Sequence, residues 1–405
     1  MRARLPGVFL LSILILYSSA SARELRIGHY RAIALLGEPR LLPDVQYVSF
    51  AGDYGFSRRL PSTEAIERHI AEESALLSNF QLKVINLEFM LPGNSKRELD
   101  RQIDKVTIDL MKRTGYNLVS RANNHAMDHG REGVTYNTGL LQDAGLKMIG
   151  TREFPIHNWE TGVGKIAIFS LTDYTDRPDP DGLILKINEA DLDLIKKELS
   201  KADFRIAFVH LGSMSPYPSP HERTQVARIL DAGADLVVCA GSHFSKGFLY
   251  ERGKPVMYDI GNHLLSYVDN VTEPVGIHFV AGFRTKKLVQ LVVIPFHNEI
   301  FSGKIGPLDE TDWASFQRTL LDRSTSDSNR YFSDPSSLIR LQEGLSRFSF
   351  NKLNELRGRH VLYAAGVLYN HYPVIVIGSG LLTVTLAVLF VRWTLLRQKK
   401  RKRET

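Results

Sequence analysis

The chain has 405 residues, of which 43% are apolar and 9% are aromatic, so it can fill the core of one large or two ordinary domains. This composition excludes an intrinsically disordered chain. The net charge of +7 would suit a nucleic-acid-binding protein, but nine cations and one anion lie in the first 22 and last 33 residues. The remaining segment has 42 basic and 43 acidic residues, so we expect no nucleic acid among the partners.

The N-terminal segment, residues 1–22, is typical of a secretory signal peptide. It begins with Arg2 and Arg4, continues with an apolar stretch at 8–17 and ends in the small-residue tripeptide ASA at 20–22. An uncleaved anchor is the alternative interpretation. In either case, the segment predicts that the main part of the chain lies outside the cytoplasm.

Strand-like and helix-like stretches then alternate along the chain. Apolar runs rich in β-branched and aromatic residues predict strands, and apolar residues at a period of 3.6 predict helices. The expected strands lie at 45–51, 83–89, 116–119, 165–171, 204–210 and 235–240, and the expected helices at 62–77, 105–113, 130–145, 189–201 and 222–232. The helix at 62–77 is expected to turn its Glu and Arg side chains to solvent. Three later runs, at 255–259, 276–283 and 288–295, have no helices between them and fit antiparallel or mixed pairing.

The C-terminal part is predicted to anchor the chain in a membrane. The uncharged run at 374–391, extended by apolar residues to 396, is long enough to cross a hydrocarbon core about 30 Å thick. The basic tail behind it predicts a cytoplasmic C-terminus, and it favours a membrane span over a buried soluble helix. A Ser/Asp-rich stretch at 322–334 is expected to mark the edge of the main domain, before a helical stretch at 336–356. The predicted organisation is a signal peptide at 1–22, a main domain at 23–305, a membrane-proximal helical region at 306–372, a transmembrane helix at 373–396 and a cytoplasmic tail at 397–405.

Side chains of the metal-binding type follow the predicted strands in five places. They are Asp53, Glu88, Asn124 with His125, His210 and His243. The carboxyl ends of neighbouring parallel strands lie on one edge of a sheet, so these side chains should converge on a shared crevice. Carboxylates, an amide oxygen and imidazoles together suit a divalent transition metal such as Mn, Fe or Zn. The alternative for Asn-Asn-His at 123–125 is a turn held by local side-chain hydrogen bonds.

The ordered motifs resemble those of the CapA family, the poly-γ-glutamate capsule synthesis proteins. The motifs are FAGD at 50–53, NLE at 86–88, ANNHAMDHG at 122–130, VHLG at 209–212, LDAGADLVVCAGSH at 230–243 and GKPVMYDIGN at 253–262. The resemblance covers roughly residues 45–296. It implies an α/β fold of the calcineurin-like metallophosphatase type, a sandwich of two sheets flanked by helices.

The resemblance also implies roles for single residues. The implied metal ligands are Asp53, Glu88 as the bridging carboxylate, Asn124, His210 and His243. His125 would face the substrate as an acid or an oxyanion donor, oriented by Asp128.

This chain departs from the family pattern at four positions. Ser245 replaces the second imidazole of a His-Pro-His triplet, Leu211 replaces an aromatic residue, and Met214 replaces an acid. The loss of ligands could leave a one-metal site or an empty one. His263 stands where the family usually has an aromatic residue; it could act as a ligand, but a partly buried histidine with satisfied hydrogen bonds is the favoured interpretation.

Two functions of different classes follow. The first is a membrane-anchored accessory protein of capsule or exopolymer biosynthesis or export, with an anionic polymer of the poly-γ-glutamate type and the polymer-synthesis machinery as partners. The second is a metal-dependent hydrolase that acts on a phosphoester or on the polymer itself. A binding module with a vestigial site is the third interpretation. Metal content and turnover of a phosphoester discriminate among them.

Overall fold

The computed structural model of the chain describes residues 24–56, 60–89, 98–212, 215–265 and 275–325. The predicted signal peptide at 1–22, the stretch at 336–356, the transmembrane helix at 373–396 and the tail at 397–405 lie outside these residues and stay predictions. Among the helices in the described ranges, none combines the length and the apolar character that crossing a membrane requires. The described residues all belong to one compact unit.

The first sheet has the strand order β1-β2-β15-β14-β3-β4-β5-β6, with β13 paired to β3 and β16 to β15. Its strands β3 to β6 run parallel to one another, whereas β2, β15, β14 and β3 alternate in direction. The bounds are β1 Glu24–Ile27, β2 Tyr30–Leu36, β3 Gln46–Gly55, β4 Leu82–Leu87, β5 Leu118–Ser120, β6 Lys147–Ile149, β13 Asn262–Leu265, β14 Val275–Arg284, β15 Lys287–Glu299 and β16 Lys304–Pro307.

The second sheet has the strand order β11-β12-β10-β9-β8-β7. Its four central strands are parallel, and the strands at the two edges, β11 and β7, are antiparallel to their neighbours. The bounds are β7 Ile156–Thr161, β8 Gly164–Thr172, β9 Phe204–His210, β10 Leu236–Ala240, β11 Phe248–Glu251 and β12 Lys254–Met257.

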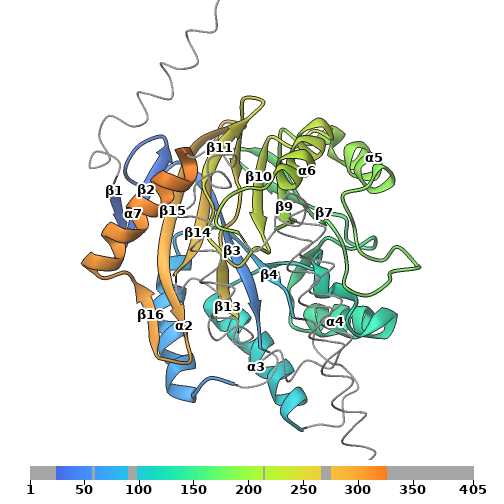
Figure 1. Ribbon diagram of the computed structural model, residues 1–405, viewed down its shortest axis with the longest axis horizontal. Coiled ribbons are helices and arrows are strands. Elements are labelled where there is room, and N and C mark those ends of the chain that lie inside the picture. Colours follow the sequence, from blue (N-terminus) through green and yellow to red (C-terminus); the bar gives the residue numbers. More distant parts are fainter. Residues whose placement is uncertain (1–23, 57–59, 90–97, 213–214, 266–274, 326–405) are drawn as a thin grey trace, which may run out of the picture. The chain divides into compact units, whose positions relative to one another are not determined.

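The described helices are α2 to α7, with two short 3₁₀ turns, η2 and η3. The bounds are α2 Thr63–Leu77, α3 Glu98–Thr114, η2 Asn124–Met127, α4 Gly130–Asp143, α5 Glu189–Glu198, η3 Leu199–Lys201, α6 Pro220–Asp231 and α7 Glu310–Thr325. Figure 1 shows α5 and α6 beside β9 and β10 of the second sheet. Serine caps start two of the helices: Ser62 accepts a hydrogen bond from the backbone of Ala65, and Ser219 forms a capping box with Glu222.

The three largest apolar cores of the described residues arrange these elements in four layers. One core lies between the two sheets, where Phe50 of β3 and Phe208 of β9 have ring centroids 5.4 Å apart. A second core joins the first sheet to α2 and α3, and a third joins the second sheet to α5 and α6. Because successive strand residues point to opposite faces, Phe50 faces the second sheet while Ala51 faces the helices. The order is therefore helix, sheet, sheet, helix.

The predicted α/β class, with two sheets flanked by helices, is confirmed at this level. Two parts of the structure differ from the expectation. The unit continues past the predicted boundary at residue 305, because α7 inserts Trp313, Phe316 and Leu320 into the core between the sheets. The prediction that the glutamates of α2 face solvent is wrong for Glu73, which is buried against polar partners that lie far away in the sequence.

Candidate metal centre

The first sheet brings two buried carboxylates together at the carboxyl ends of neighbouring strands. Asp53 lies near the end of β3, and Glu88 directly follows β4. In the β3–β4 register, Asp53 lies opposite Asn86, whose Nδ2 donates a hydrogen bond of 2.7 Å to Asp53 Oδ1. Both carboxylates are almost completely buried. Burial of two acidic groups side by side requires a positive partner.

The second sheet supplies the imidazoles. His210 is the last residue of β9, and His243 follows the end of the neighbouring strand β10. His243 Nδ1 lies 3.3 Å from Asp53 Oδ2, and its Nε2 lies 3.7 Å from Glu88 Oε1. His210 Nδ1 lies 3.5 Å from Asp53 Oδ1. The group thus forms where the strand ends of two sheets meet, rather than along the edge of a single sheet.

Glycines allow the backbone segments of the centre to approach closely. A Cβ on Gly52 would lie 1.8 Å from the carbonyl oxygen of Gly261, and a Cβ on Gly241 would lie 2.8 Å from His210 Nε2. His243 itself has a φ of 64°, in the left-handed region that costs energy for a side chain of this kind. This strained conformation directs the His243 ring to the two carboxylates.

Asn262 fixes the orientation of the His243 ring. Asn262 lies opposite Asp53 in the β13–β3 register, and its Oδ1 accepts a hydrogen bond of 2.8 Å from His243 Nδ1. A proton held on Nδ1 leaves the Nε2 lone pair directed towards Glu88. This is the tautomer that a metal ligand needs.

The charges in the centre are strongly coupled. Burial acts to raise the pKa of Asp53, but the imidazoles of His210 and His243 outweigh it and hold this pKa well below its usual range. Burial and the nearby charge of Asp53 raise the pKa of Glu88. Burial acts to lower the pKa of His243, but Glu88 and Asp53 raise it to about 10. In the absence of a metal ion, the protonated imidazole of His243 therefore balances the charge of the carboxylates.

The donor set fits a divalent transition metal ion. Ligand atoms of Asp53, Glu88 and His243 all lie within 4.8 Å of one another. Within the described residues, Asp53 Oδ2 and Glu88 Oε2 are buried without a hydrogen-bond partner. Two carboxylates and an imidazole are ligands of the kind that Mn, Fe and Zn prefer, and buried oxygens without donors are open to coordination.

The segment after β5 places its polar residues beside this group. Asn124 opens η2, and its Nδ2 donates to Asp176 Oδ2 at 3.1 Å, while its Oδ1 is buried without a hydrogen-bond partner among the described residues. His125 Nδ1 lies 2.9 Å from Asp128 Oδ2 and 3.6 Å from Asp176 Oδ2. Burial acts to lower the pKa of His125, but Asp128 and Glu88 outweigh it and raise this pKa.

The structure adds residues that sequence reasoning missed. Asn86 and Asn262 hold Asp53 and His243, and Asn123 bonds to the Leu87 carbonyl oxygen at 2.7 Å. These asparagines lie inside the motifs that resemble the CapA family, so the motifs could have identified them as residues of the site. Asp176 comes from an irregular loop after β8, where no periodicity or motif indicates its role.

Two of the positions that depart from the family pattern turn away from this group. The hydroxyl of Ser245 accepts a hydrogen bond of 3.3 Å from Arg323 of α7. The side chain of His263 reaches Glu73 of α2 instead. Met214 lies outside the described residues. The ligand roles of Asp53, Glu88, Asn124, His210 and His243 and the catalytic roles of His125 and Asp128 stay predictions.

The fold and the site together define a mixed α/β protein with a buried carboxylate–imidazole group between two sheets. The chain belongs to the family described as bacterial capsule synthesis protein PGA_cap, whose family model matches residues 47–267. This match confirms the resemblance to the CapA family. The matched residues include Asp53, Glu88, His210 and His243.

Curated relatives agree with the family. The chain is 24% identical over 178 residues to the PGA biosynthesis protein CapA of Bacillus subtilis (strain 168). This alignment covers 41% of this chain and 47% of that protein. It is also 26% identical over 209 residues to the probable polyglutamine synthesis accessory protein Rv0574c of Mycobacterium tuberculosis. This alignment covers 46% of this chain and 54% of that protein. The chain thus spans about half the length of the curated relatives it matches.

Two solved structures are distantly similar to this chain. GAP50, the anchor in the inner membrane complex of Plasmodium, aligns with a TM-score of 0.38 at 12% identity and covers 70% of this chain and 97% of that one. The 5'-nucleotidase of Candida albicans aligns with a TM-score of 0.37 at 10% identity and covers 68% of this chain and 57% of that one. Likenesses at this level are too weak to define the fold.

Proposed function

We propose that this chain is a membrane-anchored, extracytoplasmic protein of capsule or exopolymer biosynthesis or export, which holds or guides an anionic polymer of the poly-γ-glutamate type. One observation carries the proposal: Asp53, Glu88 and His243 converge within the segment that the family model matches. The names of the curated relatives, PGA biosynthesis and polyglutamine synthesis accessory proteins, support the polymer class. The apolar and basic segments at the two ends support the anchored, exported topology.

The proposed centre holds a divalent metal ion through Asp53, Glu88 and His243. His210 and the amide oxygen of Asn124 are the further ligands that we propose. When bound, such an ion supplies a Lewis acid that polarises a phosphoryl or carbonyl oxygen and lowers the pKa of a coordinated water. The calcineurin-like metallophosphatase type belongs to this proposal, and the helix–sheet–sheet–helix layering supports it.

The residues around the centre have distinct proposed tasks. His125, held by Asp128 at 2.9 Å, keeps Nε2 available to give a proton to a leaving oxygen or to bind an oxyanion. The Phe89 ring packs against the His125 ring at a tilt, with centroids 5.4 Å apart. Asn262 holds the tautomer of His243. Together these contacts pre-organise the centre for an anionic ligand.

The second candidate function is a metal-dependent phosphoesterase or polymer hydrolase. The pair formed by His125 and Asp128 favours it, because an imidazole with an orienting carboxylate is an arrangement that proton transfer uses. A purely binding role has no need of such a pair.

A cell-based experiment tests the proposed function. In the source organism, Glu88→Gln is introduced into the full-length protein, with Glu160→Gln as the matched control because the Glu160 side chain is 75% exposed. We expect loss of surface polymer, measured as glutamate released by acid hydrolysis, in Glu88→Gln only. Wild-type polymer levels in Glu88→Gln would overturn the proposal.

An assay of the purified full-length protein separates the two functions. The protein is supplied with Mn²⁺ and offered p-nitrophenyl phosphate or poly-γ-glutamate. Turnover that disappears in Glu88→Gln would favour the hydrolase. Retention of the polymer without turnover would favour the accessory role.

A further inference from the structure

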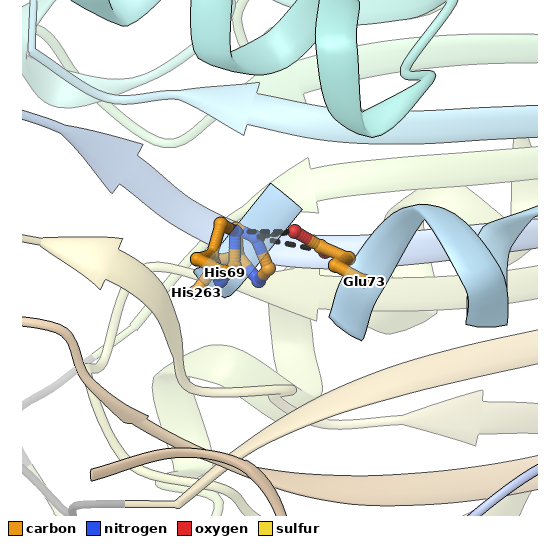
Figure 2. Close-up of side chains that lie close together, drawn as sticks. All are labelled: His69, Glu73 and His263. Atoms are coloured by element: carbon orange, nitrogen blue, oxygen red, sulfur yellow. Dashed lines mark hydrogen bonds and ion pairs between the residues drawn. The ribbon is translucent and has the colours of Figure 1, made fainter. Parts of the chain in front are cut away.

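A second group of metal-binding side chains is buried behind the first sheet, on the side of α2. It consists of His69, Glu73, His263 and His278, which we call the His69 cluster. Their side chains are 6%, 3%, 0% and 2% exposed. Figure 2 shows His69 and Glu73 on α2, with the His263 ring directed at the Glu73 carboxylate.

Three local features of the sequence bring the His69 cluster together. His69 and Glu73 are four residues apart on α2, so they lie on the same face of the helix. In β14, Ile277 and Phe279 face the core between the sheets, so His278 between them points to the helix side. His263 lies at the register shift of the β13–β3 pair, a bulge that redirects its side chain.

The Nε2 atoms of all three imidazoles converge on one carboxylate. His69 Nε2 lies 2.5 Å from Glu73 Oε2, His263 Nε2 lies 3.0 Å from Glu73 Oε1, and His278 Nε2 lies 3.3 Å from Glu73 Oε1. The Tyr116 hydroxyl also donates to Glu73 Oε1, at 2.5 Å. Ligand atoms of His69, Glu73 and His263 all lie within 4.8 Å of one another, and His278 reaches the same carboxylate. Ligand atoms around a tetrahedral ion with bonds of about 2.0 Å are about 3.3 Å apart.

The His69 cluster is separate from the candidate metal centre. Asn262 and His263 are neighbours in β13, but Asn262 bonds to His243 of the centre whereas His263 bonds to Glu73. The rings that surround His263 include Tyr54 and Phe296, which belong to the core between the first sheet and the helices. The two groups therefore use opposite faces of the same sheet.

We propose that the His69 cluster binds a divalent transition-metal ion of the Zn²⁺ type in a closed structural site. Three imidazoles and one carboxylate form a four-ligand set that suits this ion. All four donors are buried, so the site has no open position for a substrate, which is the mark of a structural rather than a catalytic ion. Its effect is to tie α2 to β13 and β14.

The competing interpretation is a metal-free network, in which one imidazolium neutralises Glu73. Such a pair needs one histidine, whereas three Nε2 atoms face this carboxylate. The Nδ1 atoms of His263 and His278 are buried without a hydrogen-bond partner among the described residues. In each of these two rings, only Nε2 faces a hydrogen-bond partner, and in both rings that partner is Glu73 Oε1. This shared direction favours an ion over an ordinary network.

Zinc content of the full-length protein tests the proposal, with Zn²⁺ alone as the probe. The double variant Asp53→Asn/His243→Ala removes ligands of the candidate metal centre, so zinc that this variant retains is bound elsewhere in the chain. We expect this variant to retain about one zinc per chain after dialysis, since a closed four-ligand site binds zinc tightly. A zinc-free double variant would overturn the proposal and leave the proposed function untouched.

Cluster variants in the same background locate the ion. His263→Phe keeps an aromatic ring among aromatic neighbours, and His69→Gln keeps a hydrogen-bonding group. We expect both to lose the retained zinc, whereas His221→Gln, at an imidazole that pairs with Asp173, keeps it. Unchanged zinc in both cluster variants would overturn the assignment.

If the cluster variants fail to fold, spectroscopy tests whether the His69 cluster binds the zinc ion. X-ray absorption at the zinc edge of the Asp53→Asn/His243→Ala protein should show imidazole nitrogens and a carboxylate oxygen at about 2.0 to 2.2 Å. A shell of water oxygens alone would contradict the site.

Discussion

Gly52 lies so close to Gly261 that a Cβ on Gly52 would stand 1.8 Å from the Gly261 carbonyl oxygen. The backbone N–H of Asp53 donates to that same oxygen at 3.3 Å. The position of a proposed metal ligand therefore depends on the absence of a side chain at the preceding residue.

The first prediction concerns this contact. Gly52→Ala forces β3 and the residue before β13 apart, and we expect it to destabilise the fold by about 1 to 3 kcal/mol and to lower metal retention. Gly139→Ala is the matched control, because a Cβ on Gly139 in α4 meets nothing; it should be neutral or stabilising by about 1 kcal/mol. Thermal melting and metal content check both. Equal melting temperatures in the two variants would contradict the prediction.

The second prediction concerns the ligands of the candidate metal centre. We expect Asp53→Ala and His243→Ala each to abolish metal retention at this centre while the fold persists, because both residues lie at strand ends rather than within an apolar core. His221→Ala, at a half-exposed imidazole, is the control. Circular dichroism and Mn²⁺ content measure the two effects. Unchanged Mn²⁺ content in both variants would remove the assignment.

The third prediction concerns the pair formed by His125 and Asp128. Asp128 lies 2.9 Å from His125 Nδ1 and helps to raise the pKa of this imidazole. Asp128→Asn removes the charge but keeps the shape, so the pKa of His125 should fall. NMR titration of the His125 ring measures the change. An unshifted titration would show that Asp128 is not the orienting partner.

The fourth prediction concerns pH. Burial lowers the pKa of His263 to about 4, so between its usual 6.5 and about 4 the unfolded chain binds a proton that the folded chain does not. Metal-free protein should therefore lose stability as the pH falls through this window, by roughly 3 kcal/mol from this group. His263→Phe should flatten this part of the curve. If the urea midpoints of the wild-type protein and of His263→Phe change with pH in parallel, His263 is not the group that causes the loss of stability.

The fifth prediction concerns the extent of the folded unit. Trp313 of α7 is 2% exposed in the core between the sheets. Trp313→Ala should cost about 3 to 5 kcal/mol, because it removes a large buried side chain and leaves a cavity. Leu321→Ala, on the exposed side of the same helix, is the control and should cost less than about 1 kcal/mol. Urea unfolding checks both. If the two variants unfold at the same urea concentration, α7 does not contribute to the core as the structure indicates.

The amino-acid sequence by itself determined the alternation of strands and helices and the strand ends at which Asp53, Glu88, His210 and His243 lie. These features are readable because parallel strands buried on both faces form continuous apolar runs, and amphipathic helices repeat at a period of 3.6. The motifs also identified the family. What these signals share is that they depend on residues close together along the chain.

Only the tertiary structure decided how those strands divide into two sheets, and that the site forms where the sheets meet. It also decided that His69, Glu73, His263 and His278 share one buried point, although α2 and β14 lie far apart in sequence. Periodicity tells which residues face a core, but not which core or which partner. Pairing between distant segments depends on packing and register over the whole chain, and therefore no local pattern contains it.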